Sequence, residues 1–425
     1  MTSVAVVGTG YVGLSSGAAL AFLGHQVHCL DVDESKIESL QAGRSPIVED
    51  GLDELIAEGL ANGCLQFSTD VAAGVSGASV VFLCLPTPQA DDGSADLTYV
   101  FGVLPLLAES LQKNAILVNK STVPVGTAVE VATRLGREDV AVVSNPEFLR
   151  QGTAVQDFLH PTRVVIGADN PDAMEVVASL YDGVDAPVLR MKTASAEALK
   201  YAANAFLATK LTFINAMADI CEVVGADIFD VAVGIGMDPR IGKDMLNAGP
   251  GWGGSCFPKD TRALVNIAAK GGYDFALLRG VIETNDQHYV RVAEKAISLC
   301  GGSVAGLTVA AWGLTFKAGT DDLRDSPAIK ILTMLNDAGA RIRAYDPTAK
   351  KAYPAFPWIE VVDTPHAACE GADVLAVLTE WPEFGEIDPT KIASLLPLRR
   401  VVDGRNVLDR EAWKSAGFEY VGIGR

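Results

Sequence analysis

Short apolar runs alternate with helical patterns through the first half of the chain. The runs are rich in β-branched residues and lie at positions 4–7, 26–30, 80–85, 116–119, 140–143 and 164–167. Continuous runs of this kind are typical of strands buried on both faces of a parallel sheet. Between the first two, apolar residues recur at helical spacing from Leu14 to Phe22. The alternation predicts an α/β domain with helices on both faces of its sheet.

A long helical pattern separates these strands from a second series. Residues 194–224 contain neither proline nor glycine, and they exceed the usual helix length of about 11–12 residues. A helical segment continues to residue 291, and further strand patterns lie at 307–313, 341–344, 372–378 and 400–402. We therefore expect an α/β fold with two Rossmann-like, doubly wound domains (residues 1–193 and 301–425). They are joined by a long central helix and a helical middle segment (194–300), and the helix offers a surface for dimerisation.

Composition and charge narrow the class of protein. The 425 residues carry a formal net charge of −19, which disfavours nucleic acid or an anionic membrane as a partner. The first residues, MTSVAVVG, lack the layout of a signal peptide, and no apolar stretch reaches membrane-spanning length. Seven scattered cysteines without a C-x-x-C pair indicate reduced thiols in a cytoplasmic protein, with no disulfide framework and no metal site.

A glycine-rich turn follows the first strand. Gly8, Gly10 and Gly13 form a G-x-G-x-x-G that opens a helix, and Asp31 lies 18 residues beyond Gly13, at the end of the next strand. This context is the one required of a dinucleotide site. Asp31 would accept hydrogen bonds from the ribose hydroxyls and repel a 2′-phosphate, so NAD is favoured over NADP. The alternative is a glycine turn in an unrelated α/β protein.

Three later strands end in polar or proline-rich turns. Because ligands of open parallel sheets bind beyond the carboxyl ends of the strands, we expect Thr87 and Thr122 on the cofactor side and Glu147 at the reacting centre. Each threonine hydroxyl would equally satisfy its own turn, and Glu147 would also fit as a solvated glutamate.

Lys200 and Asn204 lie one turn apart on the long helix. Their side chains would supply donors to substrate oxygens. The alternative is a lysine that reaches solvent and an amide at the edge of the core.

The stretch GPGWGGSCFPKD, residues 249–260, surrounds Cys256 with glycines. Glycine at this density indicates close approach of the backbone to a ligand. Ser255 fits an N-cap and Pro258 a first helical turn, so Cys256 should lie at a helix N-terminus, where a thiolate is stabilised and Lys259 adds positive charge. Asp260 would share its helix face. The alternative is a small buried cysteine in a glycine turn.

The predicted last domain, residues 301–425, has no G-x-G-x-x-G, so we expect no second dinucleotide there. Lys317, Arg324 and Arg405 follow predicted strands, where they would clamp phosphate. Solvated surface charge is the alternative for each.

With these residues placed, the sequence resembles the UDP-glucose 6-dehydrogenase branch of the nucleotide-sugar dehydrogenases. The resemblance spans essentially the whole chain and is carried, in family order, by GTGYVGL, STVPVGT, NPEFLRQGTAVQDFLHPTRVVIG, KYAANAFLATK, GPGWGGSCFPKD, GLTFKAGTDDLRDSPA and DGRN. It implies NAD-dependent oxidation of the C6 alcohol of UDP-glucose to a carboxylate, with two NAD per sugar, one catalytic cysteine and no metal. The first domain would bind NAD, the last would bind the UDP-sugar, and the protein would be a homodimer.

The resemblance also implies roles for individual residues. Cys256 would be the nucleophile, with Lys200, Asn204 and Asp260 around the oxyanion and the activated water, and Thr122 and Glu147 would help to hold that water and the base. The implied cofactor contacts are Gly8, Gly10, Tyr11, Val12, Gly13, Asp31, Lys36, Thr87, Thr122, Gln151, Lys259 and Arg324. The implied substrate contacts are Glu147, Phe148, Leu149, Arg150, Lys200, Asn204, Arg240, Met245, Leu246, Asn247, Ala248, Gly249, Gly253, Lys317 and Arg405, with Arg240 lent to the neighbouring subunit's substrate.

One position departs from the family pattern. The family commonly reads PEFL-x-EG, whereas Gln151 replaces the second acid in this chain. A neutral amide cannot act as a base, so Glu147 is the better candidate for the hydrolytic step.

Three rival interpretations stay open. The sugar nucleotide could be GDP-mannose or a UDP-N-acetylhexosamine. A two-electron hydroxyacid dehydrogenase would share the Rossmann domain, the helical spine and the Lys/Asn pair, but it would not need Cys256. A non-catalytic NAD-binding module would hardly keep Cys256, Lys259 and Asp260 together.

Overall fold

A computed structural model describes residues 1–349 and 353–425 of the chain. The chain forms two compact units. The first comprises Met1–Ala203 and Arg262–Gly272, and the second comprises Asn204–Thr261 and Tyr273–Arg425. The predicted domains were residues 1–193, 194–300 and 301–425. The predicted middle segment is shared between the two units, so this division stays a prediction. Within the described part of the chain, no helix has the length and apolarity to cross a membrane.

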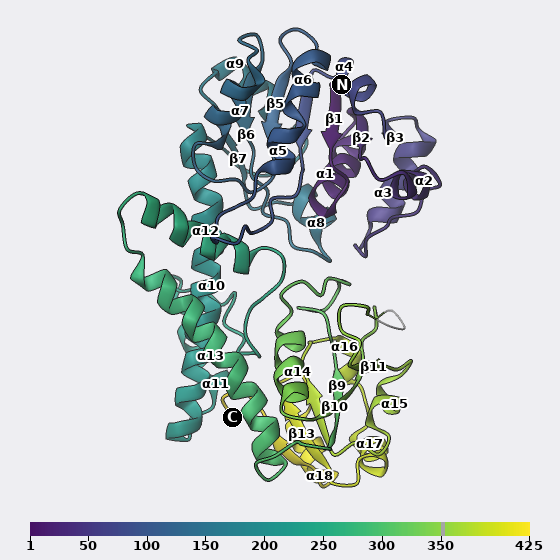
Figure 1. Cartoon of the computed structure of the whole chain (residues 1–425), viewed down its shortest axis with the longest axis vertical. Coiled ribbons are helices and arrows are strands. Elements are labelled where there is room, and N and C mark those ends of the chain that lie inside the picture. The colour runs from purple at the N-terminus through teal and green to yellow at the C-terminus, as the bar shows by residue number, and fades with distance from the viewer. Residues whose placement is uncertain (350–352) are drawn as a thin grey trace. The chain divides into compact units, whose positions relative to one another are not determined.

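The first unit contains an eight-stranded sheet of order β3-β2-β1-β4-β5-β6-β7-β8 (Figure 1). The first six strands follow the classic order of a dinucleotide-binding domain and are parallel, whereas β6 and β7 pair antiparallel at Ser144 and Gly167. The strands are β1 (Ser3–Val7), β2 (Gln26–Leu30), β3 (Leu65–Ser68), β4 (Val80–Leu83), β5 (Ile116–Asn119), β6 (Ala141–Ser144), β7 (Val164–Gly167) and β8 (Val188–Met191).

Alternate residues of these strands enter two different hydrophobic clusters. Val4 and Val6 of β1 belong to one cluster, and Ala5 and Val7 belong to the other. Since successive side chains of a strand point to opposite faces, both faces of the sheet are buried. This explains why the strands read as continuous apolar runs.

The second unit contains a six-stranded parallel sheet of order β11-β10-β9-β12-β13-β14, which repeats the same strand order. Its strands are β9 (Thr308–Trp312), β10 (Arg341–Tyr345), β11 (Ile359–Val361), β12 (Val374–Val377), β13 (Arg400–Asp403) and β14 (Glu419–Val421). In both sheets the order reverses beside the first strand, between β1 and β4 and between β9 and β12. These switch points are where α/β sheets bind ligands.

Nine helices of the first unit accompany its sheet: α1 (Tyr11–Phe22), α2 (Glu34–Gln41), α3 (Leu52–Ala61), α4 (Val71–Ser76), α5 (Thr98–Gly102), α6 (Leu104–Ser110), α7 (Thr127–Leu135), α8 (Ala154–Leu159) and α9 (Pro171–Ser179). The long helix α10 (Thr193–Val224) and helix α12 (Phe257–Lys270) each contribute residues to both units. The remaining described helices are α11 (Ile228–Gly236), α13 (Ala276–Leu299), α14 (Pro327–Asp337), α15 (Pro365–Cys369), α16 (Pro382–Gly385), α17 (Pro389–Leu395) and α18 (Arg410–Ser415).

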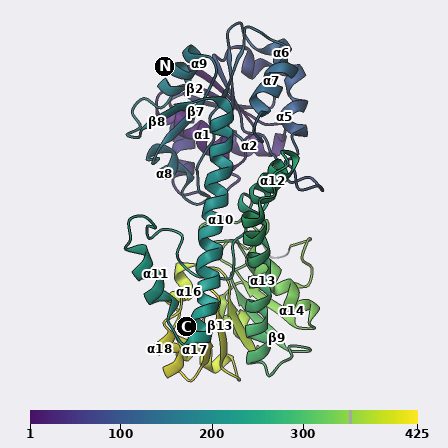
Figure 2. The same cartoon turned by 90° about the vertical axis from the view of Figure 1, so that its left-hand side faces the viewer.

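The predicted fold class is confirmed: two Rossmann-like sheets and a long central helix are present (Figure 2). The predicted central helix matches α10 to within one residue. The strand predicted at 140–143 lies one residue later, and the strand predicted at 80–85 ends at Leu83 because the chain turns toward Pro86. Sequence patterns missed β3, β8, β11 and β14.

Candidate active site

The glycine-rich turn after β1 is shaped by close backbone contacts. Gly8 has a φ of +97°, and a Cβ on it would lie 2.6 Å from the carbonyl oxygen of Cys84, at the end of β4. A Cβ on Gly13 would lie 1.9 Å from the Gly8 carbonyl oxygen. Gly10 is different, because a Cβ there would meet no described heavy atom within 4 Å and its φ is −74°. The protein's own packing therefore explains Gly8 and Gly13, while Gly10 leaves room for a pyrophosphate at the start of α1, beside Tyr11 and Val12.

This difference gives a prediction with an internal control. Gly10→Ala should fold with a melting temperature within about 2 °C of the parent, since a surface change without a clash costs under about 0.5 kcal/mol. Its NAD affinity should fall at least about tenfold, because the new methyl group occupies the space that a pyrophosphate needs. Gly13→Ala should instead lower the melting temperature. Calorimetric titration with NAD and thermal denaturation measure both effects, and normal NAD binding by Gly10→Ala would contradict this assignment.

Asp31 lies at the end of β2 and is held by its neighbours. Its Oδ2 accepts hydrogen bonds from the Thr9 backbone N–H (2.9 Å), the Thr9 hydroxyl (2.7 Å) and Lys36 Nζ (2.9 Å). Burial raises the pKa of Asp31, but the hydrogen bonds from Lys36 and Thr9 outweigh burial and leave the pKa below its ordinary value. The carboxylate is thus ionised and oriented, as an acceptor for ribose hydroxyls must be.

Glu147 and Lys200 form a buried ion pair inside the first unit. Lys200 Nζ lies 3.0 Å from Glu147 Oε1, and the two side chains are only 5% and 6% exposed. Glu147 Oε2 accepts the Leu149 N–H at 2.5 Å, and the Phe148 ring centroid lies 5.1 Å from Lys200 Nζ. Neither alternative interpretation holds, because Glu147 is not a solvated glutamate and Lys200 does not extend to solvent. A buried pair of this kind is costly to break from one side.

The loop after β5 is tied to the loop after β4. The Thr87 hydroxyl donates to the Thr122 carbonyl oxygen at 2.9 Å, and the Ser121 hydroxyl donates to the Leu85 carbonyl oxygen at 2.7 Å. Thr87 therefore donates to a neighbouring loop and not to its own turn, and its oxygen can still accept a hydrogen bond. Thr122 is buried, and it lines a small cavity of about 10 Å³ together with Lys200.

Cys256 is the exposed cysteine of this chain, and the other six are buried or half-buried. Helix α12 begins at the next residue, Phe257, and the Asp260 N–H donates to the Cys256 carbonyl oxygen at 2.9 Å. Cys256 itself therefore occupies the cap position that we predicted for Ser255, because the chain becomes helical one residue later than expected. Pro258 lies in the first turn, as predicted. The alternative of a buried cysteine is wrong.

Exposure and burial predict which thiol reacts first. With limiting iodoacetamide at pH 8, Cys256 should be alkylated at least about tenfold faster than any other cysteine, since access and thiolate content control the rate. Burial raises the pKa of Cys84 to about 12, only partly offset by Lys120, and burial also raises the pKa values of Cys29 and Cys369. Peptide mass spectrometry checks the order. Faster labelling of the half-buried Cys64 or Cys300 would contradict it.

Asp260 is almost fully buried in the second unit, at 1% exposure. Its Oδ2 accepts a hydrogen bond from Asn204 Nδ2 at 2.6 Å, and its Oδ1 lies 2.5 Å from Lys259 Nζ. Asp260 therefore joins Lys259 to α10, one helical turn beyond Cys256. Asn204 is also buried, so it is not an amide at the edge of the core. Asp260, together with Lys259 and Asn204, can orient an attacking nucleophile or water through charge-assisted hydrogen bonds.

The glycines before Cys256 have a structural reason of their own. A Cβ on Gly253 would lie 2.0 Å from the Asp325 carbonyl oxygen. Gly251 and Gly254 have φ values of +114° and +83°, and their Cβ atoms would lie 2.5 Å and 2.8 Å from the rings of Tyr289 and Phe316. The close approach expected toward a ligand is, at these three positions, an approach to protein atoms.

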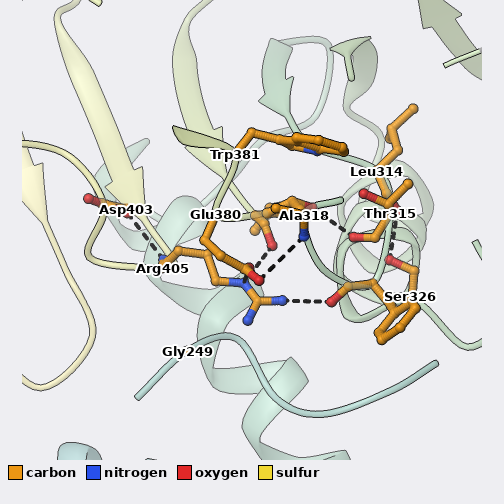
Figure 3. A network of polar contacts seen from close by, with 12 residues as sticks. Gly249, Leu314, Thr315, Ala318, Ser326, Glu380, Trp381, Asp403 and Arg405 are labelled. Atoms are coloured by element: carbon orange, nitrogen blue, oxygen red, sulfur yellow. Dashed lines mark hydrogen bonds and ion pairs between the residues drawn. The ribbon is translucent and has the colours of Figure 1, made fainter. Parts of the chain in front are cut away.

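Arg405 follows β13 and is the centre of a polar network in the second unit (Figure 3). Its Nε donates to the Leu378 carbonyl oxygen at 3.0 Å, and its Nη2 donates to the Phe316 carbonyl oxygen at 2.9 Å, beside Lys317. Glu380 Oε2 lies 3.0 Å from Arg405 Nε, and Glu380 Oε1 accepts the Ala318 N–H at 3.3 Å. Arg405 and the Lys317 loop are thus brought together next to the switch point between β9 and β12.

Three further predicted arginines each pair with an aspartate. Arg324 and Arg240 are exposed and pair with Asp322 and Asp238, each at 2.6 Å. Arg150 pairs with Asp157 at 2.6 Å. Gln151 precedes Gly152, whose N–H donates to Glu49 Oε2 at 2.8 Å. The structure leaves the predicted roles of these arginines and of Gln151 as predictions.

Sequence reasoning missed several supporting residues. Glu197 is buried on α10 and accepts hydrogen bonds from the N–H groups of Gly126 (2.7 Å) and Ala128 (2.8 Å) at the start of α7. It thereby anchors the loop that carries Thr122, and its spacing three residues before Lys200 was a usable signal. Burial raises the pKa of Glu197, and these backbone N–H groups offset the shift only in part. No local sequence pattern indicated that Glu380 would contact Arg405.

Comparison with known proteins agrees with this geometry. Models of the UDP-glucose/GDP-mannose dehydrogenase family match residues 2–185 (NAD binding domain), 194–287 (central domain) and 310–410 (UDP binding domain). The UDP-glucose 6-dehydrogenase TuaD of Bacillus subtilis (strain 168) is 44% identical over 433 residues, covering 100% of this chain and 94% of that protein.

Two solved structures share the fold over nearly the whole chain. A UDP-glucose dehydrogenase from the hyperthermophilic archaeon Pyrobaculum islandicum has a TM-score of 0.91 at 36% identity, covering 100% of this chain and 98% of that chain. A UDP-D-ManNAc dehydrogenase from Pyrococcus horikoshii has a TM-score of 0.88 at 26% identity, covering 99% of both chains. The chain belongs to the UDP-glucose/GDP-mannose dehydrogenase family and is an NAD-dependent oxidoreductase.

Proposed function

We propose that this protein oxidises C6 of UDP-glucose twice, giving UDP-glucuronate, through a thiohemiacetal and a thioester on Cys256. The observation that carries the proposal is the exposed Cys256 thiol, which immediately precedes α12 and lies one turn from the buried Asp260–Asn204 pair. A two-electron hydroxyacid dehydrogenase would have no use for an exposed thiol in this setting.

Bound NAD would accept one hydride in each of the two oxidations. The residues present fit it, since Gly10 leaves space for a pyrophosphate and Asp31 is held as an ionised acceptor for ribose hydroxyls. Two NAD molecules are needed for each sugar because four electrons leave C6.

The chemistry at C6 balances in three steps. In the first step, C6 loses a hydride, and the hydroxyl group on C6 loses its proton to a base, which is either a lysine side chain or a water molecule. The product is an aldehyde. In the second, the Cys256 sulfur forms a bond to C6, and loss of a second hydride gives a thioester. In the third, water activated through Glu147 or Asp260 cleaves the C–S bond, releasing the carboxylate and the thiolate. The covalent bond keeps the half-oxidised sugar on the protein between the two oxidations.

Lys200 and Asn204 would donate to the oxygen that becomes negative in the tetrahedral intermediates. Such donors are commonly worth about 3–4 kcal/mol each in the transition state. Thr122 would help to hold the water. In the second unit, Arg405 and Lys317 would bind the pyrophosphate and the sugar, and residues 245–249 with Gly253 would close over the nucleotide.

Sequence similarity to relatives of known name favours UDP-glucose over other sugar nucleotides as the substrate. The relative named for UDP-glucose is 36% identical to this chain, against 26% for the one named for UDP-D-ManNAc. An NADH-formation assay with equal concentrations of UDP-glucose, GDP-mannose and UDP-N-acetylglucosamine tests this choice. A higher kcat/KM with either competitor would replace the substrate and keep the mechanism.

The stoichiometry tests the mechanism itself. With limiting UDP-glucose and excess NAD, we expect two NADH for each sugar consumed and UDP-glucuronate as the product. One NADH per sugar, with an aldehyde or ketone as product, would favour the two-electron alternative.

We also propose that the protein is a cytoplasmic homodimer that pairs through α10. On the part of α10 within the second unit, Phe206, Phe213 and Ile220 recur every seven residues and are 66%, 53% and 50% exposed. A seven-residue apolar repeat is the spacing that packs one helix against another. Sedimentation equilibrium should give twice the chain mass for the parent and the single-chain mass for Phe213→Asp. Monomeric behaviour of the parent would refute the dimer.

A further inference from the structure

The peptide of Gly249 is held from both sides by buried side chains of the second unit. Its N–H donates to Asn215 Oδ1 of α10 at 2.9 Å, and its carbonyl oxygen lies 2.8 Å from His288 Nε2 of α13. Asn215 and His288 are 3% and 2% exposed. Both backbone groups are therefore fixed by residues distant in sequence, in a segment that would otherwise have no regular hydrogen bonding.

Gly249 also lies directly against Arg405. A Cβ on Gly249 would be 3.3 Å from Arg405 Nη1 and 3.5 Å from Arg405 Cδ. Figure 3 shows the guanidinium between Glu380 and the chain at Gly249. A movement of the Gly249 peptide would therefore change both the end of the 245–249 loop and the space around Arg405, which are two parts of the proposed nucleotide site.

Each ring nitrogen of His288 faces one oxygen atom. A carbonyl oxygen can only accept, so Nε2 must carry a proton to contact Gly249. Nδ1 lies 3.4 Å from Asp219 Oδ2, and this oxygen also accepts from Arg291 Nη1. Burial raises the pKa of Asp219, but His288 and Arg291 outweigh burial and bring it below its ordinary value.

We propose that His288 is a positioning residue for the nucleotide-binding loop, with its Nε2 donating to the Gly249 carbonyl oxygen and its ring lying against Asp219. Asp219 of α10 and the Gly249 carbonyl oxygen are the polar groups that contact its ring, and Arg291 of α13 reaches it through Asp219. The role in catalysis rests on the proposed function, because the loop is taken to bind the UDP-sugar.

Three substitutions of His288 distinguish its contact with Gly249 from its contact with Asp219. Glutamine carries an N–H at the reach of Nε2, so His288→Gln should keep the Gly249 contact and lose the one to Asp219. His288→Asn should do the reverse, and His288→Leu should lose both. We expect His288→Asn and His288→Leu to raise KM for UDP-glucose about tenfold, the effect of one net hydrogen bond. Their kcat and KM for NAD should stay within about twofold, and His288→Gln should stay within about threefold of the parent throughout.

Two outcomes of the kinetics would overturn the proposal. One is a parent-like KM in His288→Asn and His288→Leu, and the other is a defect in His288→Gln as large as that in His288→Leu. Calorimetric titration with UDP gives the same comparison without catalysis. If the parent makes no NADH from UDP-glucose, the proposed function fails, while UDP affinities still decide the role of His288.

The contact made by Nε2 has its own measurement, which does not depend on catalysis. The chain has five histidines, so ¹⁵N-histidine labelling of the parent gives a small set of ring signals, and the signal absent from His288→Gln identifies His288. Nε2 should carry a proton in the presence of UDP, as donation to the Gly249 carbonyl oxygen requires. A signal that shows no proton on Nε2 would refute the contact with Gly249.

Discussion

Cys256→Ser is expected to bind NAD and UDP-glucose normally and to release UDP-glucuronate at least about a thousandfold more slowly than the parent. The serine hydroxyl is a far weaker nucleophile at neutral pH, because a thiol yields an appreciable fraction of its reactive anion there and an unassisted hydroxyl does not. The first oxidation does not need the sulfur, so it is retained in principle. The second oxidation does need it, because the hydride leaves from a carbon that is bonded to sulfur.

The measurement combines NADH fluorescence with chromatographic analysis of the sugar nucleotide. Cys300→Ser is the matched control, since Cys300 is a half-buried cysteine of the same unit at the end of α13. It should turn over at the parent rate. Turnover of Cys256→Ser within about tenfold of the parent would remove the covalent mechanism, and loss of NAD binding would point to a folding defect.

The strands that could be predicted most directly are those buried along nearly their whole length. β1, β4, β5 and β9 are of this kind and read as apolar runs, so they were found with small errors at their ends. The missed strands lie at or near the sheet edges, where one face meets solvent. In β8 the four residues VLRM are all half-buried or exposed. An edge strand of this length has no pattern that separates it from a loop.

The candidate site could be predicted one residue at a time, but its pairings could not. Spacing on one helix gave Lys200 and Asn204, yet their partners Glu147 and Asp260 lie 53 and 56 residues away in the sequence. The lysine pairs with a carboxylate inside the first unit, and the asparagine pairs with one inside the second. His288 carried no local signal at all, because its meaning comes from Gly249 and Asp219, which only the tertiary structure brings to it.

Lys200→Met should lose two things that can be measured separately. The first is catalysis: one lost donor to the tetrahedral oxyanion should lower kcat about 100- to 1000-fold. The second is stability, because the substitution leaves the Glu147 carboxylate buried without its ion pair. Breaking a buried pair from one side typically costs about 3–5 kcal/mol. Methionine keeps most of the length and apolar contact of the lysine stem, including its position beside Phe148.

A double variant separates these losses. In Lys200→Met/Glu147→Gln, the neutral amide no longer needs a cation, so most of the lost stability should return, while activity should stay at or below that of Lys200→Met. Lys210→Met on the same helix is the control, since Lys210 is half-buried and donates to the Ile241 carbonyl oxygen outside the buried pair. It should keep the parent kcat. Urea denaturation and NADH formation measure the two effects. If the double variant regained activity together with stability, Lys200 would be a structural partner of Glu147 and would not be a donor in the reaction.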